Sequence, residues 1–276
     1  MNRREFLAGA VAAAAAARAI AGPLGLPIGC QTYPVRDSIG KDFDGTLKEL
    51  AAAGFQTIEM CSPPGYATSG YGPLVGMKAA EMRKHIEDAG LHCPSCHYGF
   101  KELKENLDDR IAFAKELGLT QMVLSTFGIA KTAPMEDWTR AASQLNEIGQ
   151  RIQTAGLQLG YHNHDGEFQE IDRTLVYDAL MRTFDPKMVK MQFQTSVVSL
   201  GFQAATYFKK YPGRFLSIHV ADWSSAEKKQ VAVGQGVIDW KQLFAAAKTG
   251  GVRNYFVEMN LDLMRASVPY LKKLPT

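Results

Sequence analysis

The stretch Tyr161-His162-Asn163-His164-Asp165 locates a candidate site, because a short apolar strand there runs directly into a group of polar side chains. Side chains two positions apart on a strand point to the same side, so His162 and His164 share a face. Three later segments repeat this design: residues 192–195 (QFQT), 217–222 (SIHVAD) and 255–260 (YFVEMN). Because polar groups gather at the ends of apolar strands, we expect these strand ends to meet in one site.

Strand-like and helix-like segments alternate along the rest of the chain. Glycine follows several of the predicted helices, for example at Gly54, Gly90, Gly118 and Gly156, where it is the usual C-terminal stop. Eight such strand–helix units favour a closed barrel over an open doubly wound sheet, and no G-x-G-x-x-G follows the first strand. We therefore predict an α/β fold in which residues 22–276 form a single (β/α)8 TIM barrel, a fold of typically ~250 residues.

The first 21 residues have the pattern of an export signal. Arg3-Arg4 precede an alanine-rich apolar run over residues 8–17, and Ala19-Ile20-Ala21 offers a small-residue cleavage site. This order is typical of a twin-arginine (Tat) signal peptide. The apolar run ends before Arg18, short of the ~20 residues that a membrane span needs. We therefore expect a periplasmic or otherwise exported protein without a permanent membrane anchor.

The charge balance is close to neutral. The whole chain has 31 Lys and Arg against 28 Asp and Glu, and removal of residues 1–21 changes these counts to 28 and 27. A protein that binds nucleic acid needs a cationic surface, so we expect no nucleic-acid partner. Assembly into a homo-oligomer is left open.

Several segments of the chain resemble, in the same order, those of the xylose isomerase-like sugar phosphate isomerase/epimerase family. The resembling segments are residues 54–59 (GFQTIE), 161–168 (YHNHDGEF), 212–222 (PGRFLSIHVAD), 233–240 (VGQGVIDW) and 256–258 (FVE). The resemblance covers essentially all of residues 22–276. It implies a TIM barrel enzyme that acts on a small-molecule sugar.

The resemblance also implies a metal site. Members of the family typically hold one divalent metal by a carboxylate on strand five, an aspartate on strand six, a histidine on strand seven and a glutamate on strand eight. In this chain His219 and Glu258 match, whereas His162 and Gln194 stand where the two other carboxylates are expected. The implied ligands are His162, Gln194, His219 and Glu258. Two imidazoles with one carboxylate suit Zn²⁺, Mn²⁺, Fe²⁺ or Co²⁺ better than Mg²⁺.

The candidate catalytic residues are Glu258, His162 and His164. A carboxylate in a buried strand needs a partner, which favours a site role for Glu258, and two histidines on one strand face offer a metal ligand and a general base together. The expected chemistry is proton abstraction next to a carbonyl, leading to isomerisation or epimerisation. Expected substrate contacts are Glu59, His97, Asp165, Asp222, Trp223 and Asn260.

Two alternatives remain open from the sequence. One is a metal-independent sugar lyase or hydratase, because the expected metal site has lost two carboxylates. The other is a barrel that binds carbohydrate without turnover. Export away from the cytosolic sugar phosphates favours an unphosphorylated sugar or keto-sugar derivative as the ligand.

Overall fold

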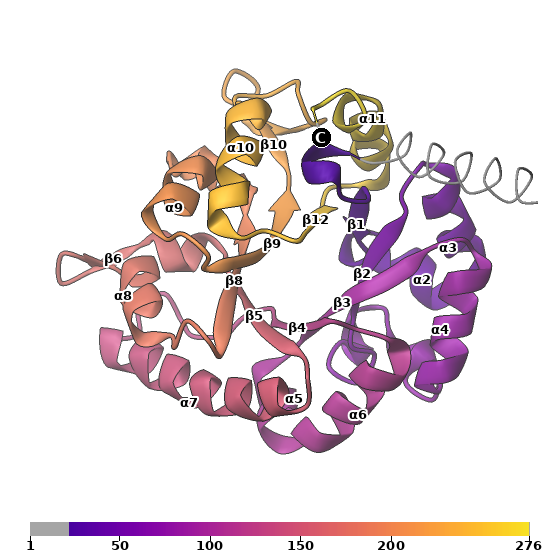
Figure 1. The fold of residues 1–276 in the computed structure, drawn as a ribbon, viewed down its shortest axis with the longest axis horizontal. Coiled ribbons are helices and arrows are strands. Elements are labelled where there is room, and N and C mark those ends of the chain that lie inside the picture. The colour runs from indigo at the N-terminus through magenta and orange to yellow at the C-terminus, as the bar shows by residue number, and fades with distance from the viewer. Residues whose placement is uncertain (1–21, 276) are drawn as a thin grey trace, which may run out of the picture.

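The computed structural model describes residues 22–275, and over these residues eight parallel strands close into one barrel ringed by helices (Figure 1). The strands, in chain order, are β1 (Gly29–Gln31), β2 (Thr57–Cys61), β3 (His92–Tyr98), β4 (Gln121–Leu124), β5 (Gln158–His162), β8 (Val189–Gln194), β9 (Phe215–Val220) and β12 (Asn254–Val257). Neighbours around the barrel follow chain order, and β12 closes it against β1. The predicted fold class is confirmed, while the predicted export signal over residues 1–21 lies outside the described residues.

Helices cover the outer side of the barrel. The α-helices are α2 (Arg36–Lys41), α3 (Phe43–Ala52), α4 (Ala79–Asp88), α5 (Phe100–Glu105), α6 (Leu107–Leu117), α7 (Met135–Thr154), α8 (Val176–Thr183), α9 (Ala204–Lys210), α10 (Trp240–Gly250) and α11 (Leu261–Leu271). Short 3₁₀ helices are η1 (Pro23–Gly25), η2 (Tyr33–Val35), η3 (Ala67–Ser69), η4 (Gly72–Leu74), η5 (Asp165–Phe168) and η6 (Thr195–Leu200). As the glycine pattern predicts, Gly118 ends α6 in the left-handed conformation at φ +90°.

Two small antiparallel sheets extend the connections after β5 and β9. One pairs β6 (Glu170–Ile171) with β7 (Thr174–Leu175), and it projects from the barrel (Figure 1). The other pairs β10 (Asp222–Ser224) with β11 (Lys229–Val231). Both connections leave strands that carry candidate site residues, so loop structure is concentrated around the predicted site.

Strand register brings the polar strand ends to one level of the barrel. His162 of β5 pairs with Gln192 of β8, and Gln194 pairs with His219 of β9. On the other side Gln31 of β1 pairs with Glu59 of β2. These side chains are buried. The barrel therefore has a polar centre, which must be satisfied by internal hydrogen bonds.

Asp222 fixes the loop between β11 and α10. Its carboxylate accepts hydrogen bonds from Trp240 Nε1 at 2.8 Å and from the backbone N–H groups of Gly234 and Gly236 at 2.9 and 3.1 Å. A Cβ on Gly236 would lie 2.1 Å from Asp222 Oδ1. Glycine is therefore required there, which gives a structural reason for the V-G-Q-G-V segment.

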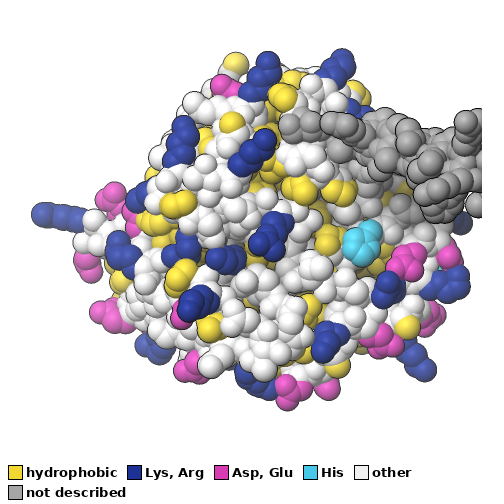
Figure 2. Space-filling view, viewed as in Figure 1, with side chains coloured by type: hydrophobic (Ala, Val, Ile, Leu, Met, Phe, Trp, Pro, Cys, Tyr) yellow, Lys and Arg dark blue, Asp and Glu magenta, His cyan; other side chains and the backbone are white. Residues whose placement is uncertain are grey.

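The surface carries charges of both signs. Figure 2 shows Lys and Arg side chains scattered singly over the viewed face, with Asp and Glu mostly towards its rim. Within residues 22–275 no helix combines the length and the apolarity required to cross a membrane.

An aromatic cluster stabilises the wall of β8. Phe193 is fully buried and packs against Tyr177, Tyr207, Phe208 and Phe215, with ring centroids 5.5–6.2 Å apart. We predict that Phe193→Ala lowers the free energy of unfolding by about 3–5 kcal/mol, because the barrel wall cannot collapse into the cavity. Chemical denaturation measures this loss. Val75→Ala, at an exposed position, is the control and is expected to change stability by less than about 0.5 kcal/mol; equal effects of the two variants would contradict the prediction.

Candidate functional site

The imidazole of His219 lies between two carboxylates at the centre of the site. Its Nδ1 is 2.9 Å from Oε2 of Glu258, and its Nε2 is 2.5 Å from Oε1 of Glu59. Burial opposes a charge on this ring, but Glu258 and Glu59 outweigh burial and raise the pKa of His219 to about 10. The two residues expected from strands seven and eight, His219 and Glu258, therefore meet in one place.

Glu59 is fully buried and receives hydrogen bonds from several strands. Gln31 Nε2 donates to its Oε1 at 2.8 Å, and Gln192 Nε2 donates to its Oε2 at 2.8 Å. Ser95 Oγ donates to the same Oε2. Burial opposes the charge, yet His97 and His219 hold the pKa of Glu59 well below its usual range. Glu59 is thus an ionised group enclosed by protein. Its link to the site is its contact with His219 Nε2.

Three histidines form a cluster that fits one metal ion. One ring nitrogen from each of His97, His162 and His219 lies within 4.8 Å of the others. The ring centroids of His162 and His219 are 4.4 Å apart, and those of His97 and His219 are 5.1 Å apart. The sequence assigned His97 to substrate, but the structure joins it to the histidine cluster.

His162 offers an unused nitrogen in this cluster. The residue is 1% exposed, and its Nδ1 has no hydrogen-bond partner within residues 22–275. Burial lowers the pKa of His162 well below its usual value, and repulsion by His219 and His164 adds to this effect. His162 is therefore neutral near pH 7, the state in which a histidine binds a metal or accepts a proton.

His164 lies at the open side of the cluster. The residue is exposed, and its ring centroid is 4.7 Å from that of His162. Loss of hydration lowers the pKa of His164, and repulsion by His97 and His219 adds to this in spite of the attraction of Glu258. Its backbone N–H donates to Glu167 Oε2 at 2.8 Å, and Tyr161 Oη donates to the other oxygen of Glu167. Glu167 thus fixes the turn that presents His164.

Gln194 orients Glu258 through its amide nitrogen. Gln194 Nε2 donates to Glu258 Oε2 at 2.5 Å, while its own oxygen accepts from the backbone N–H of Ser196 at 3.3 Å. An amide nitrogen is not a metal ligand, so Gln194 in this orientation supports Glu258 instead of binding an ion. The side chain of Glu258 is 19% exposed, and its Oε1 has no hydrogen bond to any residue in the range 22–275.

The other expected substrate contacts lie further out or have structural partners. Asp165 is exposed at the start of η5, and Trp223 is half-buried in β10. The carboxylate of Asp222 is occupied by the loop donors described above. The last strand ends at Val257, and Asn260 caps α11 by accepting from Leu263 N at 3.0 Å. Asn260 therefore does not continue a strand face with Glu258.

The three histidine nitrogens fit a divalent metal, and Glu258 lies next to them, 2.9 Å from His219 Nδ1. The Nδ1 atom of His162 is buried and has no hydrogen-bond partner within residues 22–275. His219 points its Nδ1 at Glu258, and its Nε2 lies against the carboxylate of Glu59. A metal-binding histidine usually donates its other ring N–H to a carboxylate in this manner. His97 is less suited through Nε2, because that nitrogen faces two acceptors, Gln192 Oε1 at 2.7 Å and Glu59 Oε1 at 3.2 Å.

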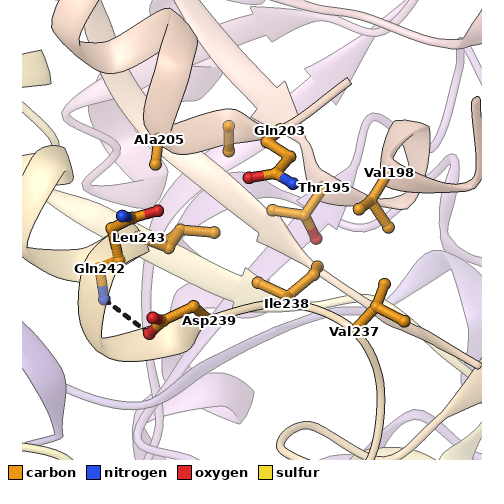
Figure 3. A pocket seen from close by; sticks show the side chains of 10 residues that line it. Thr195, Val198, Gln203, Ala205, Val237, Ile238, Asp239, Gln242 and Leu243 are labelled. Carbon is orange, nitrogen blue, oxygen red and sulfur yellow. Dashed lines mark hydrogen bonds between the residues drawn. The ribbon is translucent and has the colours of Figure 1, made fainter. Parts of the chain in front are cut away.

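A pocket lies beside the cluster, between η6 and the first turns of α9 and α10 (Figure 3). Thr195, Val198, Ile238 and Leu243 are among its lining residues, which include none of the clustered histidines or glutamates. Thr195 Oγ1 donates to Ala221 O at 2.8 Å, so it closes the gap between the ends of β8 and β9. The pocket is thus separate from the histidine cluster, although Thr195 directly follows Gln194 in the chain.

Sequence reasoning missed two supporting residues, Gln31 and Ser217, whereas Glu167, just beyond His162 and His164, was expected as an orienting carboxylate and holds the turn at His164. Ser217 Oγ accepts from Gln192 Nε2 at 2.8 Å and stands two positions before His219 on the same strand face. That spacing was a usable signal for Ser217. Gln31 gave no comparable signal, because its partner Glu59 lies on another strand.

The comparisons with known proteins agree with this architecture. Two relatives are named inosose dehydratase: that of Lacticaseibacillus casei is 27% identical over 48% of this chain and 50% of its own length, and that of Geobacillus thermodenitrificans (strain NG80-2) is 24% identical over 78% and 80%. This chain thus spans about half the length of the first relative. A sugar phosphate isomerase/epimerase structure from Parabacteroides distasonis ATCC 8503 superposes with a TM-score of 0.77 at 22% identity, over 90% of this chain and 94% of that one.

The family model described as "Xylose isomerase-like TIM barrel" matches residues 47–274, which is most of the chain and includes His97, His162, His219 and Glu258. The expected resemblance is thereby confirmed, and this chain belongs to the xylose isomerase-like TIM barrel family.

Proposed function

We propose that this protein is an enzyme that removes a proton from the carbon next to the carbonyl of a sugar derivative and then completes an isomerisation. The observation that carries the proposal is a neutral, exposed imidazole, His164, beside a buried cluster in which His162, His219 and Glu258 converge. A base that is neutral near pH 7 next to a fixed group of polar donors is the arrangement that general base catalysis requires.

In this proposal His164 carries the proton through the reaction. Its unprotonated ring nitrogen takes the proton as the C–H bond breaks, and the electron pair of that bond forms the C–C double bond of an enediolate. The resulting imidazolium returns the proton to the neighbouring carbon, while the O–H bond at the first carbon breaks to form the new carbonyl and its proton passes to the enediolate oxygen. These transfers complete an aldose–ketose isomerisation. One base on one face suffices for this step, whereas epimerisation at a single carbon requires proton return from the opposite face.

The charge that develops on the carbonyl oxygen needs stabilisation. A divalent metal held by His162, His219 and Glu258 would supply it as a Lewis acid, and two imidazoles with one carboxylate favour Zn²⁺, Mn²⁺, Fe²⁺ or Co²⁺. Gln194 holds the carboxylate of Glu258 in place, and Glu59 holds the ring of His219. These residues therefore keep the electrophilic side of the site fixed while His164 moves the proton.

Dehydration is the second candidate function, and the names of the two curated relatives favour it. The first step is the same, and the outcome differs in where the proton goes. If the imidazolium of His164 protonates a hydroxyl group at the next carbon, that C–O bond breaks and water leaves. The same protein residues would thus serve isomerisation and dehydration. Which of the two occurs depends on whether the substrate has a hydroxyl group that can leave from the next carbon.

We further propose that the substrate is an unphosphorylated sugar or keto-sugar. The support is the export pattern of residues 1–21, because an exported enzyme does not meet cytosolic sugar phosphates.

Replacement of His164 tests the proposed base. We predict that His164→Asn lowers kcat by about 10²–10⁴-fold, the range typical of a lost general base, with little change in KM or stability because the residue is exposed. Screening of free aldoses, ketoses and keto-sugars, with product analysis by NMR and mass spectrometry, first identifies the reaction. His92→Asn at the exposed start of β3 is the control, and unchanged turnover in His164→Asn would remove His164 from the mechanism.

Metal removal tests the electrophilic side of the site. We predict that dialysis against a chelator lowers turnover by about 100-fold or more, since a Lewis acid contributes several kcal/mol of charge stabilisation, and that Mn²⁺, Co²⁺ or Zn²⁺ restores it. Metal content is measured by mass spectrometry at each stage. Full activity at less than stoichiometric metal would support the metal-independent lyase instead.

Localisation tests the export proposal. We predict that the full chain appears in the periplasmic fraction of a Tat-competent bacterium, and that Arg3→Lys with Arg4→Lys retains it in the cytoplasm because the paired arginines are the recognised signal. Cell fractionation with immunodetection measures the distribution. Equal periplasmic amounts of both proteins would argue against Tat export and weaken the case for an unphosphorylated substrate.

A further inference from the structure

The carboxylate of Glu59 is the point at which five strands of the barrel are joined. It belongs to β2, and its partners come from β1 (Gln31), β3 (Ser95 and His97), β8 (Gln192) and β9 (His219). The residue is 0% exposed, so it does not contact a bound sugar. A role for Glu59 must therefore act through its neighbours.

The contact with His219 has a directional consequence. Nε2 of His219 lies 2.5 Å from Oε1 of Glu59, and both oxygens of Glu59 already accept hydrogen bonds from Gln31, Ser95 and Gln192. Glu59 is thus the acceptor in this contact, and Nε2 carries the hydrogen. With Nε2 held in this way, the ring plane and the direction of Nδ1 are set, and Nδ1 points at Glu258. The buried residue Glu59 thus determines which nitrogen of the His219 ring faces the partly exposed Glu258.

We infer that Glu59 is a positioning residue that fixes the orientation and the Nε2–H form of His219, and so presents Nδ1 of His219 to the Glu258 side of the site. The inference rests on the proposed function only for its effect on turnover. The ring orientation itself is a property of the protein without metal or substrate.

The surrounding network explains why a carboxylate is needed. Every partner of Glu59 presents a hydrogen to it: the amides of Gln31 and Gln192, the hydroxyl of Ser95, and the Nε2 atoms of His97 and His219. A glutamine at position 59 would have the same shape but would place its own NH₂ group against at least one of these donors. Glu59→Gln is therefore a conservative change in volume and a specific change in hydrogen bonding.

A matched control exists elsewhere in the barrel. Glu102 of α5 is also a buried carboxylate, and it accepts from Ser62 Oγ at 2.5 Å and Arg110 Nη1 at 3.3 Å. Among residues 22–275, its hydrogen-bond partners include none of the clustered histidines. Glu102→Gln removes the same buried charge by the same substitution without touching His219, and so separates a general loss of stability from a loss of ring orientation.

The first measurement is NMR of metal-free protein labelled with ¹⁵N in the histidine rings, with the His219 signals assigned by comparison with His219→Gln. We expect the wild type and Glu102→Gln to show a slowly exchanging, downfield Nε2–H of His219. Glu59→Gln is expected to lose this signal. Glu59→Asp keeps the charge and is expected to retain a weaker, shifted signal, which supplies the test if Glu59→Gln does not fold. Retention of the wild-type His219 signals in a folded Glu59→Gln, or equal loss in Glu102→Gln, would overturn the inference.

The second measurement is Co²⁺ affinity, followed by visible absorption in competition with a chelating dye. We expect Glu59→Gln to bind Co²⁺ about 10- to 100-fold more weakly, the usual effect of losing the partner of a metal-binding histidine, and Glu102→Gln to bind as the wild type does. Unchanged Co²⁺ affinity in Glu59→Gln would overturn the inference for the metal. If the wild type bound no Co²⁺, the metal-assisted part of the proposed function would fail, while the NMR result would still decide the role of Glu59.

Discussion

The structure depends on one buried ionic contact, the imidazole of His219 held between the carboxylates of Glu59 and Glu258. Isolated charges at the centre of a barrel are strongly unfavourable, because water is lost and nothing replaces it. Here each carboxylate is offset by the same ring, and Glu59 receives further donors from Gln31, Ser95 and Gln192. The charges are thus retained only as a connected set, and removal of one member leaves the others unpaired.

This set also explains the protonation states of the surrounding histidines. A positive His219 repels a second positive charge nearby, and burial acts in the same direction on His162. In the metal-free protein the roles are divided within one cluster: His219 is the charged ring, which must lose its Nδ1 proton to bind a metal, while His162 and His164 remain neutral near pH 7. Groups whose environments move their pKa values apart are typical of acid–base sites.

The replacement of two expected carboxylates by His162 and Gln194 fits the same electrostatic balance. Two further negative charges near Glu258 would need a cation to offset them. With neutral groups at both positions, Glu258 is satisfied by His219 Nδ1 and Gln194 Nε2. The carboxylate of Glu258 is therefore offset without a bound cation, whereas a site with three carboxylates would need one.

The barrel could be predicted from the sequence, because strand and helix periodicity, helix-ending glycines and apolar strands with polar ends are local properties of the chain. The strand order also predicted that His162, His219 and Glu258 lie at the ends of the fifth, seventh and eighth barrel strands. The contacts that each polar group makes depend on the packing of distant strands and could not be predicted. Glu59 is buried and contacts His219, and Gln194 donates its amide nitrogen to Glu258. Asp222 accepts hydrogen bonds from the glycine loop, and Asn260 caps α11. These outcomes depend on contacts between residues up to 160 positions apart, and no local pattern specifies which of several buried donors and acceptors will pair.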